Sequence, residues 1–208
     1  MHAHETSLLA LLIAFPLLGA IFNGALGRKL KTEVIHTAAI AAVVIPALLG
    51  WVLFFQLVGF EEHDRALHQV LFEWIHVGTF KADFGLWLDP LSAVMVLIIT
   101  NVGALIHLYS VGYMKGDPSY HRFFAYLNLF IFSMLCLVLG DSLVLLFLGW
   151  EGVGLCSYLL IGFWFEERAN AKAGKKAFIV NRVGDFGFAL GMMLLFMLFG
   201  SVDPQSIN

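Results

Sequence analysis

Residues 142–165 read SLVLLFLGWEGVGLCSYLLIGFWF, an apolar run in which Glu151 is the one charged side chain. A helix that crosses the hydrocarbon core of a bilayer needs about 20 predominantly apolar residues. This run is long enough, and the apolar flanks on both sides place Glu151 near its middle. It therefore predicts a membrane-spanning helix that carries a carboxyl group at depth.

The composition of the whole chain agrees with that prediction. Of its 208 residues 60% are hydrophobic and 13% are charged, and the mean hydropathy is +0.86. Soluble domains are about half apolar and one quarter charged, so an ordinary soluble globular protein is excluded. The net charge of -3 and the short basic clusters leave no long basic face for nucleic acid.

Six apolar runs meet the length requirement of the bilayer. We predict an all-α, polytopic membrane bundle, divided into a first helix pair (1–60), an outer-face connection (61–88) and four further helices (89–208). No cleavable signal is evident, because Met1–Thr6 carries Glu5 and no Lys or Arg. The predicted spans are 7–26, 34–58, 90–112, 123–139, 142–165 and 172–199.

The connection between the second and third spans predicts a small β-hairpin. From Phe80 to Leu88 apolar and other residues alternate with the period of two that is typical of a strand. An earlier run, 71–77, ends at Gly78-Thr79, which suits a turn. An irregular loop that caps the helix ends is the alternative, and Trp87 suits the aromatic belt at the membrane interface.

The basic residues predict the orientation, because cytoplasmic loops collect Lys and Arg. If both ends of the chain lie outside, the outer loops hold only Arg65 and Lys81, and Arg182 lies inside a span. The inner loops then hold the other basic residues, which are Arg28, Lys29, Lys31, Lys115, Arg122, Arg168, Lys172, Lys175 and Lys176. We therefore expect both ends on the outer side.

Several other residues have ordinary structural interpretations. Small residues at a spacing of four, such as Ala20 and Gly24, let membrane helices approach closely, and Asp89 and Asp141 are predicted to cap helices. Cys136 and Cys156 have no disulfide or metal-site pattern and are predicted to be core residues. Gly184, Gly187 and Gly191 share the small-residue spacing, and no function is assigned to His2, His4, His63 and His68.

Ionisable residues within the spans are the candidate functional residues, because each costs about 2.5–3.5 kcal/mol near the centre of a membrane helix on insertion scales. Glu151 has no Lys or Arg within a turn, so a charge partner must come from another helix. The bilayer favours the neutral acid and a nearby cation favours the carboxylate. Glu151 therefore suits a proton relay, and a hydrogen-bonded acid that locks helices together is the alternative.

Two further signals accompany Glu151. Arg182 and Asp185 lie three residues apart on one helix face, so they can form an ion pair inside the membrane, and Lys175 continues that face toward the inner mouth. A structural and a functional role are both compatible with this pair. His107, near the inner end of its span, suits proton transfer at neutral pH, although a hydrogen-bonded interface histidine is the alternative.

The motifs of this chain resemble those of the antiporter-like subunit L family of proton-pumping NADH:quinone oxidoreductase, respiratory complex I. The segment 148–164, LGWEGVGLCSYLLIGFW, resembles the helix-five segment of that family and is the most specific of the motifs. The general scheme is shared with other antiporter-like subunits and with multisubunit Na⁺/H⁺ antiporters. Further similar stretches, in the same order, are LDPLS (88–92), LIHLYS (105–110), GYM (112–114), RFFAY (122–126) and NRVGD (181–185).

The resemblance implies roles for the charged residues. Glu151 would be the essential glutamate of helix five, facing a lysine on a later, broken helix, and Arg182 and Asp185 would be a charged pair at the inner half-channel or toward an adjacent subunit. That lysine and the broken helices follow the point that corresponds to Asn208. We therefore expect a fragment, a split subunit or the ordered part of one, which cannot form a complete proton path alone.

The resemblance also implies a place in a larger assembly. Flavin and Fe–S clusters would belong to other subunits, as would the reactions of NADH and quinone, and this chain lacks GxGxxG, Walker, CxxCH and Fe–S motifs. The expected partners are other membrane subunits, especially a neighbouring antiporter-like one, and the bilayer of a bacterial inner membrane or an equivalent. The alternatives are the large subunit of a Na⁺/H⁺ antiporter and a scaffold without transport.

Overall fold

The computed structural model describes residues 3–61, 64–78 and 80–204, and within them six helices are long and apolar enough to cross a membrane. This arrangement confirms the predicted all-α membrane bundle. Predictions on His2, His63 and Thr79 lie outside the described residues. The helices are α1 (Leu9–Leu26), α2 (Thr32–Val58), α3 (Pro90–Tyr113), α4 (Tyr120–Leu139), α5 (Leu143–Ile161) and α6 (Arg168–Phe199).

The helix ends differ from the predicted spans where the sequence changes from apolar to polar. Two helices begin a turn earlier than hydropathy predicts, α4 at Tyr120 and α6 at Arg168. Their first turns carry polar side chains that can lie outside the hydrocarbon while the backbone stays helical. Conversely, α5 ends at Ile161 instead of continuing to residue 165, because Gly162 ends the helix.

The two predicted aspartate caps have different outcomes. Asp89 caps α3: its Oδ1 accepts a hydrogen bond from the Ser92 backbone N–H at 2.7 Å, and the Ser92 side chain accepts one in return from the Asp89 backbone. The prediction for Asp141 is wrong. The neighbouring Ser142 is the cap of α5, because its Oγ accepts from the Leu145 N–H, so Asp141 is left to make a different contact.

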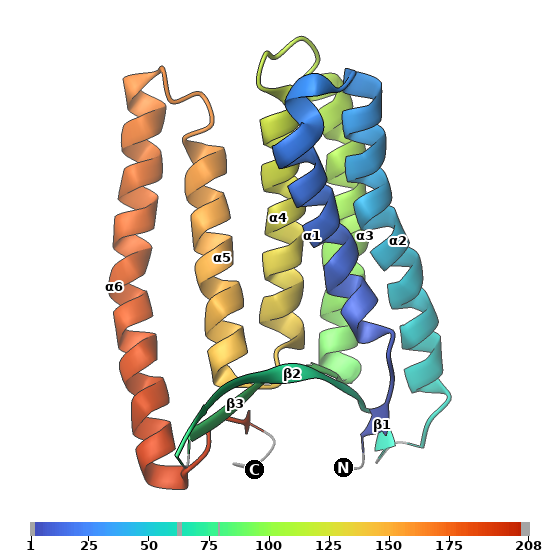
Figure 1. Cartoon of the computed structure of the whole chain (residues 1–208), viewed down its shortest axis with the longest axis vertical. Helices are drawn as coiled ribbons and strands as arrows, with labels where there is room; N and C mark the ends of the chain where they lie inside the picture. Colours follow the sequence, from blue (N-terminus) through green and yellow to red (C-terminus); the bar gives the residue numbers. More distant parts are fainter. Residues whose placement is uncertain (1–2, 62–63, 79, 205–208) are drawn as a thin grey trace.

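The helices pack in an order that leaves the last two at one side of the bundle (Figure 1). The first four pack against one another around the main core, α5 packs on α4, and α6 packs on α5. In α6 only Gly174 and Asp185 are buried by the rest of this chain. Because an apolar helix face needs no cover from water inside a bilayer, this exposure suits a membrane helix.

The contact between α4 and α5 depends on two glycines. A Cβ at Gly149 would lie 2.4 Å from the backbone nitrogen of Leu137, and one at Gly152 would lie 2.5 Å from Ser133 Oγ. Gly154, two residues later, has nothing within 4 Å of that position. The absence of side chains at 149 and 152 therefore lets α5 approach α4 closely. It also determines which face of α5 lies against α4, and hence in which direction Glu151 points.

The small-residue pairs predicted to pack have different outcomes as well. Ala20 is buried, and a Cβ at Gly24 would lie 3.8 Å from the Ala125 side chain of α4. At Gly184, Gly187 and Gly191, by contrast, no atom of the described residues lies within 4 Å of that position. Close packing at these three glycines is therefore not present within the described part of this chain.

The connection between α2 and α3 supplies two strands of a three-stranded sheet, and residues before α1 supply the third. Strands β2 (Leu67–Val77) and β3 (Phe80–Leu88) pair antiparallel, which confirms the predicted hairpin, and Gly78 adopts a positive φ of 60° in its turn. The sequence did not predict the short strand β1 (His4–Glu5), which pairs parallel with the start of β2.

The sheet, both described ends of the chain and the start of α5 lie at one end of the bundle, and the α1–α2, α3–α4 and α5–α6 connections lie at the other (Figure 1). The nine basic residues of the predicted inner loops belong to the latter end or its adjoining helix turns. The charge asymmetry therefore separates the two ends of the bundle as the sequence predicts.

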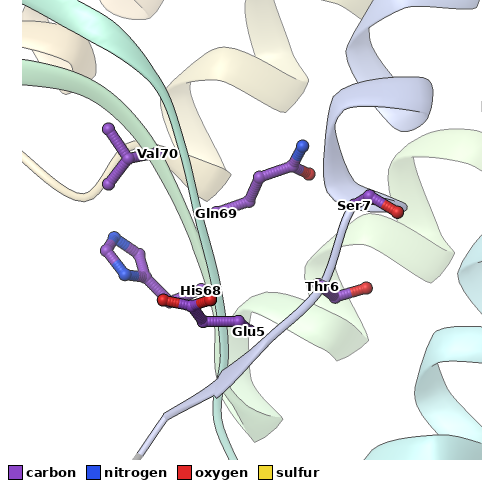
Figure 2. A pocket seen from close by; sticks show the side chains of 6 residues that line it. All are labelled: Glu5, Thr6, Ser7, His68, Gln69 and Val70. Atoms are coloured by element: carbon purple, nitrogen blue, oxygen red, sulfur yellow. The ribbon is translucent and has the colours of Figure 1, made fainter.

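Two neighbouring residues of β2 attach the sheet to different helices. Gln69 points toward the start of α1, where its Oε1 accepts a hydrogen bond from the Ala10 backbone nitrogen at 2.9 Å. The His68 side chain points to the opposite side of the strand (Figure 2). His68 Nε2 lies 3.1 Å from Asp141 Oδ2, at the beginning of α5. Asp141 N–H also donates to the Gly85 carbonyl of β3 at 3.1 Å. The hairpin is thus tied to the helix that carries Glu151.

A valine at position 152 should weaken the α4–α5 contact, because its Cβ would overlap Ser133 Oγ. Overpacking of this kind typically costs about 1–3 kcal/mol. We expect Gly152→Val to lower the thermal stability of the detergent-purified protein and Gly154→Val, at an open position, to leave it nearly unchanged. Equal melting temperatures for the two variants would contradict this account of the interface.

The His68–Asp141 pair should make the attachment of the hairpin pH-dependent. The hydrogen bond to Asp141 raises the pKa of the His68 imidazole above its ordinary value of 6.5, although burial opposes the shift and the nearby acids Asp203 and Glu5 add to it. Because the raised pKa belongs to the folded state, the stabilisation is complete below 6.5 and is lost as the pH rises through the raised value.

We therefore expect hydrogen exchange in β2, corrected for its intrinsic pH dependence, to become faster as the pH rises above 6.5 and through the raised pKa of His68. The His68→Gln variant should show little of that change. An equal change in both proteins would show that another group is responsible.

Candidate functional site

The charged residues predicted inside the membrane meet where α5 faces α6. Arg182 of α6 donates through Nη1 to Glu151 Oε1 of α5 and forms an ion pair with it. The sequence predicted that a partner for Glu151 must come from another helix, and the structure places Arg182 in that position. Glu151 retains 20% of its side-chain exposure in this chain, so most of the carboxylate is removed from the surface.

Asp185 is the second carboxylate of the site. Its Oδ2 lies 3.8 Å from Arg182 Nε, one helical turn away, which confirms that the two residues share a face of α6. Its Oδ1 accepts a hydrogen bond of 2.8 Å from the indole N–H of Trp150. Asp185 therefore has its closest polar contact with α5 and a longer, ionic contact with Arg182.

Consecutive residues of α5 thus hold two residues of α6. Trp150 binds Asp185 and Glu151 binds Arg182, so the two helices are bridged twice. The indole of Trp150 also lies nearly parallel to the ring of Phe188, at an interplanar angle of 9° and a centroid distance of 6.3 Å. Phe188 stacks in the same way on Phe147. The two polar bridges fix the rotation of α6 relative to α5, and the rings fill the space between the helices.

The cluster contains one cation between two carboxylates. When all three groups are ionised, Arg182 can fully compensate only one of the acids, and the other must be stabilised by neutral donors or take up a proton. The structure shows Glu151 with the cation and Asp185 with the neutral indole donor. An arrangement of this kind can bind a proton when the cation moves from one acid to the other.

A cavity of about 340 Å³ adjoins this cluster between α4, α5 and α6. Trp150 and Asp185 line it, and so do the polar side chains of Ser157 and Asn181. A cavity of this size has room for several waters, each of which needs about 10–15 Å³ of accessible space and two or more polar partners, and these polar side chains can supply the partners within a mainly apolar lining. The cluster is therefore next to a space that can be hydrated.

Lys175 lies closer to the basic end of α6, as predicted, and lines a second cavity of about 200 Å³ together with Arg122, Tyr126 and Tyr158. Phe178 lies between this cavity and the acidic cluster: its ring stands 5.6 Å from that of Tyr158 and 4.7 Å beneath the guanidinium of Arg182. Lys175 and Arg182 are thus on one continuous face, separated by an aromatic ring.

His107 has a different environment. It is buried in α3, donates through Nδ1 to the Gly103 carbonyl at 2.8 Å and lies 3.2 Å from Asn128 Oδ1 of α4. Asn128 in turn donates to the Ala39 carbonyl of α2. This network joins three helices, whereas Glu151, Arg182 and Asp185 bond to one another. A proton-transfer role for His107 stays a prediction.

The cysteines and the other residues that could bind a metal ion form no second site in the described part of the chain. Cys136 and Cys156 are both buried as free thiols, in agreement with the prediction that they are core residues. Across residues 3–61, 64–78 and 80–204, no three His, Cys, Asp or Glu side chains gather in a way that could hold a metal ion.

The sequence did not predict the roles of two residues that contact α5 or α6, one at the charge cluster and one in the sheet. Trp150 was noted only as part of the motif, although the presence of a hydrogen-bond donor beside Glu151 is a usable signal in a membrane helix, where such donors seek partners. His68 was given no role, and no local signal links it to Asp141, because the two lie 73 residues apart.

Two protein-family models match this chain. Residues 74–124 match the family described as NADH-Ubiquinone oxidoreductase (complex I), chain 5 N-terminus. Residues 140–208, which include α5 and α6, match the family described as NADH:quinone oxidoreductase/Mrp antiporter, TM.

Individual relatives are similar over nearly the whole chain. NADH-quinone oxidoreductase subunit L of Mycobacterium tuberculosis is 50% identical over 95% of this chain and 31% of its own length. Subunit L of Pseudomonas aeruginosa is 44% identical over 97% of this chain and 33% of its own. NADH-ubiquinone oxidoreductase chain 5 of Chondrus crispus is 44% identical over 95% and 29%. The chain thus spans about a third of the length of these relatives.

Solved structures share the fold. An archaeal membrane-bound sulfane sulfur reductase matches 98% of this chain and 41% of its own chain with a TM-score of 0.78 at 18% identity. The Mrp complex of Dietzia sp. DQ12-45-1b matches 96% of this chain and 20% of its own with a TM-score of 0.77 at 24% identity.

The fold, the charge cluster between α5 and α6 and the family matches define the class: the chain belongs to the antiporter-like membrane subunits shared by NADH:quinone oxidoreductases and Mrp antiporters. Within that class its similarity is to the amino-terminal part of NADH-quinone oxidoreductase subunit L, also named chain 5. The resemblance that the motifs predicted is therefore confirmed.

Proposed function

We propose that this chain is the amino-terminal part of a proton-translocating membrane subunit of an NADH:quinone oxidoreductase. The observation that carries the proposal is the Glu151–Arg182–Asp185 cluster, in which two carboxylates compete for one cation between two membrane helices. The names of the relatives support the choice of complex.

In the proposed mechanism Glu151 is the proton-binding group, and two cations switch its protonation: Arg182 of this chain, and the lysine that the resemblance places on a later helix. While Arg182 is paired with it, Glu151 stays ionised. When Arg182 turns toward Asp185, the Glu151 carboxylate is left in a low dielectric and takes up a proton, because an unpaired charge is costly there. The return of Arg182 releases that proton. Lys175, at the basic end of the same helix, adds positive charge at the inner mouth.

The wider assembly is part of the same proposal. Flavin, Fe–S clusters, NADH oxidation and quinone reduction are assigned to other subunits, so this chain carries no redox site. Its partners are other membrane subunits, with an antiporter-like subunit as the neighbour. A multi-pass position in a bacterial inner membrane follows, with the sheet end outside and the basic end in the cytoplasm, in accordance with the positive-inside rule.

A stand-alone Na⁺/H⁺ antiporter is the second candidate, because the family matched by residues 140–208 includes Mrp antiporters and the Dietzia Mrp complex shares the fold. The two candidates differ in what they need. Proton transport by the first depends on NADH oxidation, whereas the second transports ions without NADH or quinone.

The test is the Glu151→Gln substitution in the native membrane complex that contains this chain. Loss of a positioned proton-transfer group typically slows a step by about 10²–10⁴-fold. We expect the path through this chain to close, so that fewer protons are pumped for each NADH oxidised while the complex still assembles. Pumping is measured in inverted vesicles with a pH-sensitive dye, and NADH oxidation is measured in parallel.

Glu166→Gln is the matched control. Glu166 is exposed in the α5–α6 connection, and its substitution removes the same negative charge. It should leave the ratio of protons to NADH unchanged. Normal pumping by an assembled Glu151→Gln complex would refute the proposal, and Na⁺-dependent proton transport without NADH would favour the antiporter.

A further inference from the structure

Trp150 makes a contact that the proposed mechanism does not use. Its indole N–H donates to Asp185 Oδ1 at 2.8 Å, whereas Arg182 Nε is 3.8 Å from the other oxygen of the same carboxylate. Asp185 is buried, with 8% of its side chain exposed. The direct hydrogen bond to this buried acid therefore comes from a neutral group and not from the neighbouring cation.

A neutral donor and a cation affect the cluster in different ways. The indole stabilises the Asp185 carboxylate without cancelling its charge, and hydrogen bonds to a charged acceptor are stronger than neutral ones. Because Asp185 is already stabilised by Trp150, the guanidinium of Arg182 is available to Glu151, with which it pairs. Without the indole donor, Arg182, one turn away on α6, can turn to Asp185, and Glu151 would then lose the counter-charge that this chain supplies.

We infer that Trp150 is a positioning residue that sets the resting partner of Arg182. By holding Asp185 it keeps the cation on Glu151 and so fixes the state from which proton uptake begins. This inference rests on the proposed function, since it concerns the regulation of the same site. It assigns Trp150 no contact with the transferred proton.

The chain allows the hydrogen bond and the ring packing of Trp150 to be separated. Trp150→Phe keeps an aromatic ring against Phe188 and removes the N–H donor. Phe188→Leu removes the stacking partner and keeps the donor, so it is the matched control. Benzothienylalanine at position 150 retains the bicyclic ring and lacks only the N–H, and it replaces Trp150→Phe if that variant assembles poorly.

The first measurement is the pH profile of proton pumping in the native complex. A hydrogen bond to a charged group corresponds to about a tenfold change in an equilibrium. Because loss of the counter-charge favours the neutral acid, removing the hydrogen bond should displace the profile to higher pH by about one unit. The Phe188→Leu complex should keep the profile of the unaltered protein. A purely structural role would lower pumping at all pH values without displacing the profile.

The second measurement is the structure of the assembled Trp150→Phe complex. We expect Arg182 to hydrogen-bond to Asp185 and to have left Glu151. An undisplaced pH profile together with an intact Arg182–Glu151 pair would overturn the inference while a closed path in Glu151→Gln still stood. Normal pumping by Glu151→Gln would instead overturn the proposed function.

Discussion

The ion pair between Glu151 and Arg182 is the interaction on which the rest of the site depends, because it brings two charges into a region that otherwise excludes them. Each charge would cost about 2.5–3.5 kcal/mol near the centre of a membrane helix on insertion scales, and breaking such a pair leaves an uncompensated charge. The two charges are therefore stable in the membrane only while each of them has a partner of opposite charge. Asp185, held by Trp150, supplies the alternative partner for Arg182 within one helical turn.

The scaffold around the pair has two mechanical parts. The first four helices form a packed bundle, and Gly149 and Gly152 set α5 closely against it, so one side of the site is rigid. The other side is α6, which meets the described part of the chain mainly through α5. Movement of Arg182 therefore needs no rearrangement of the main core. The hairpin adds a link from the sheet end of the bundle to the beginning of α5 through His68 and Asp141.

Much of the fold was predictable because bilayer thickness and strand alternation are local signals. Hydropathy predicted six spans, and period two predicted the strand of residues 80–88. A two-residue strand such as β1 has no period to detect. Asp141 was taken for a cap because Asp and Ser are both good caps, and only the structure shows that Ser142 has that role. At the site the charged residues were predictable from their cost in the membrane, whereas the preference of Arg182 for Glu151 depends on the rotation of α6, which no local pattern encodes.

The central claim is that Glu151 gains and loses a proton during turnover, and infrared difference spectroscopy of the native complex tests it most directly. The account predicts a protonated carboxyl signal that changes on addition of NADH and quinone and is absent from the Glu151→Gln variant. An identical difference spectrum in both proteins, with the unaltered complex pumping normally, would show that Glu151 keeps one protonation state and would contradict the account.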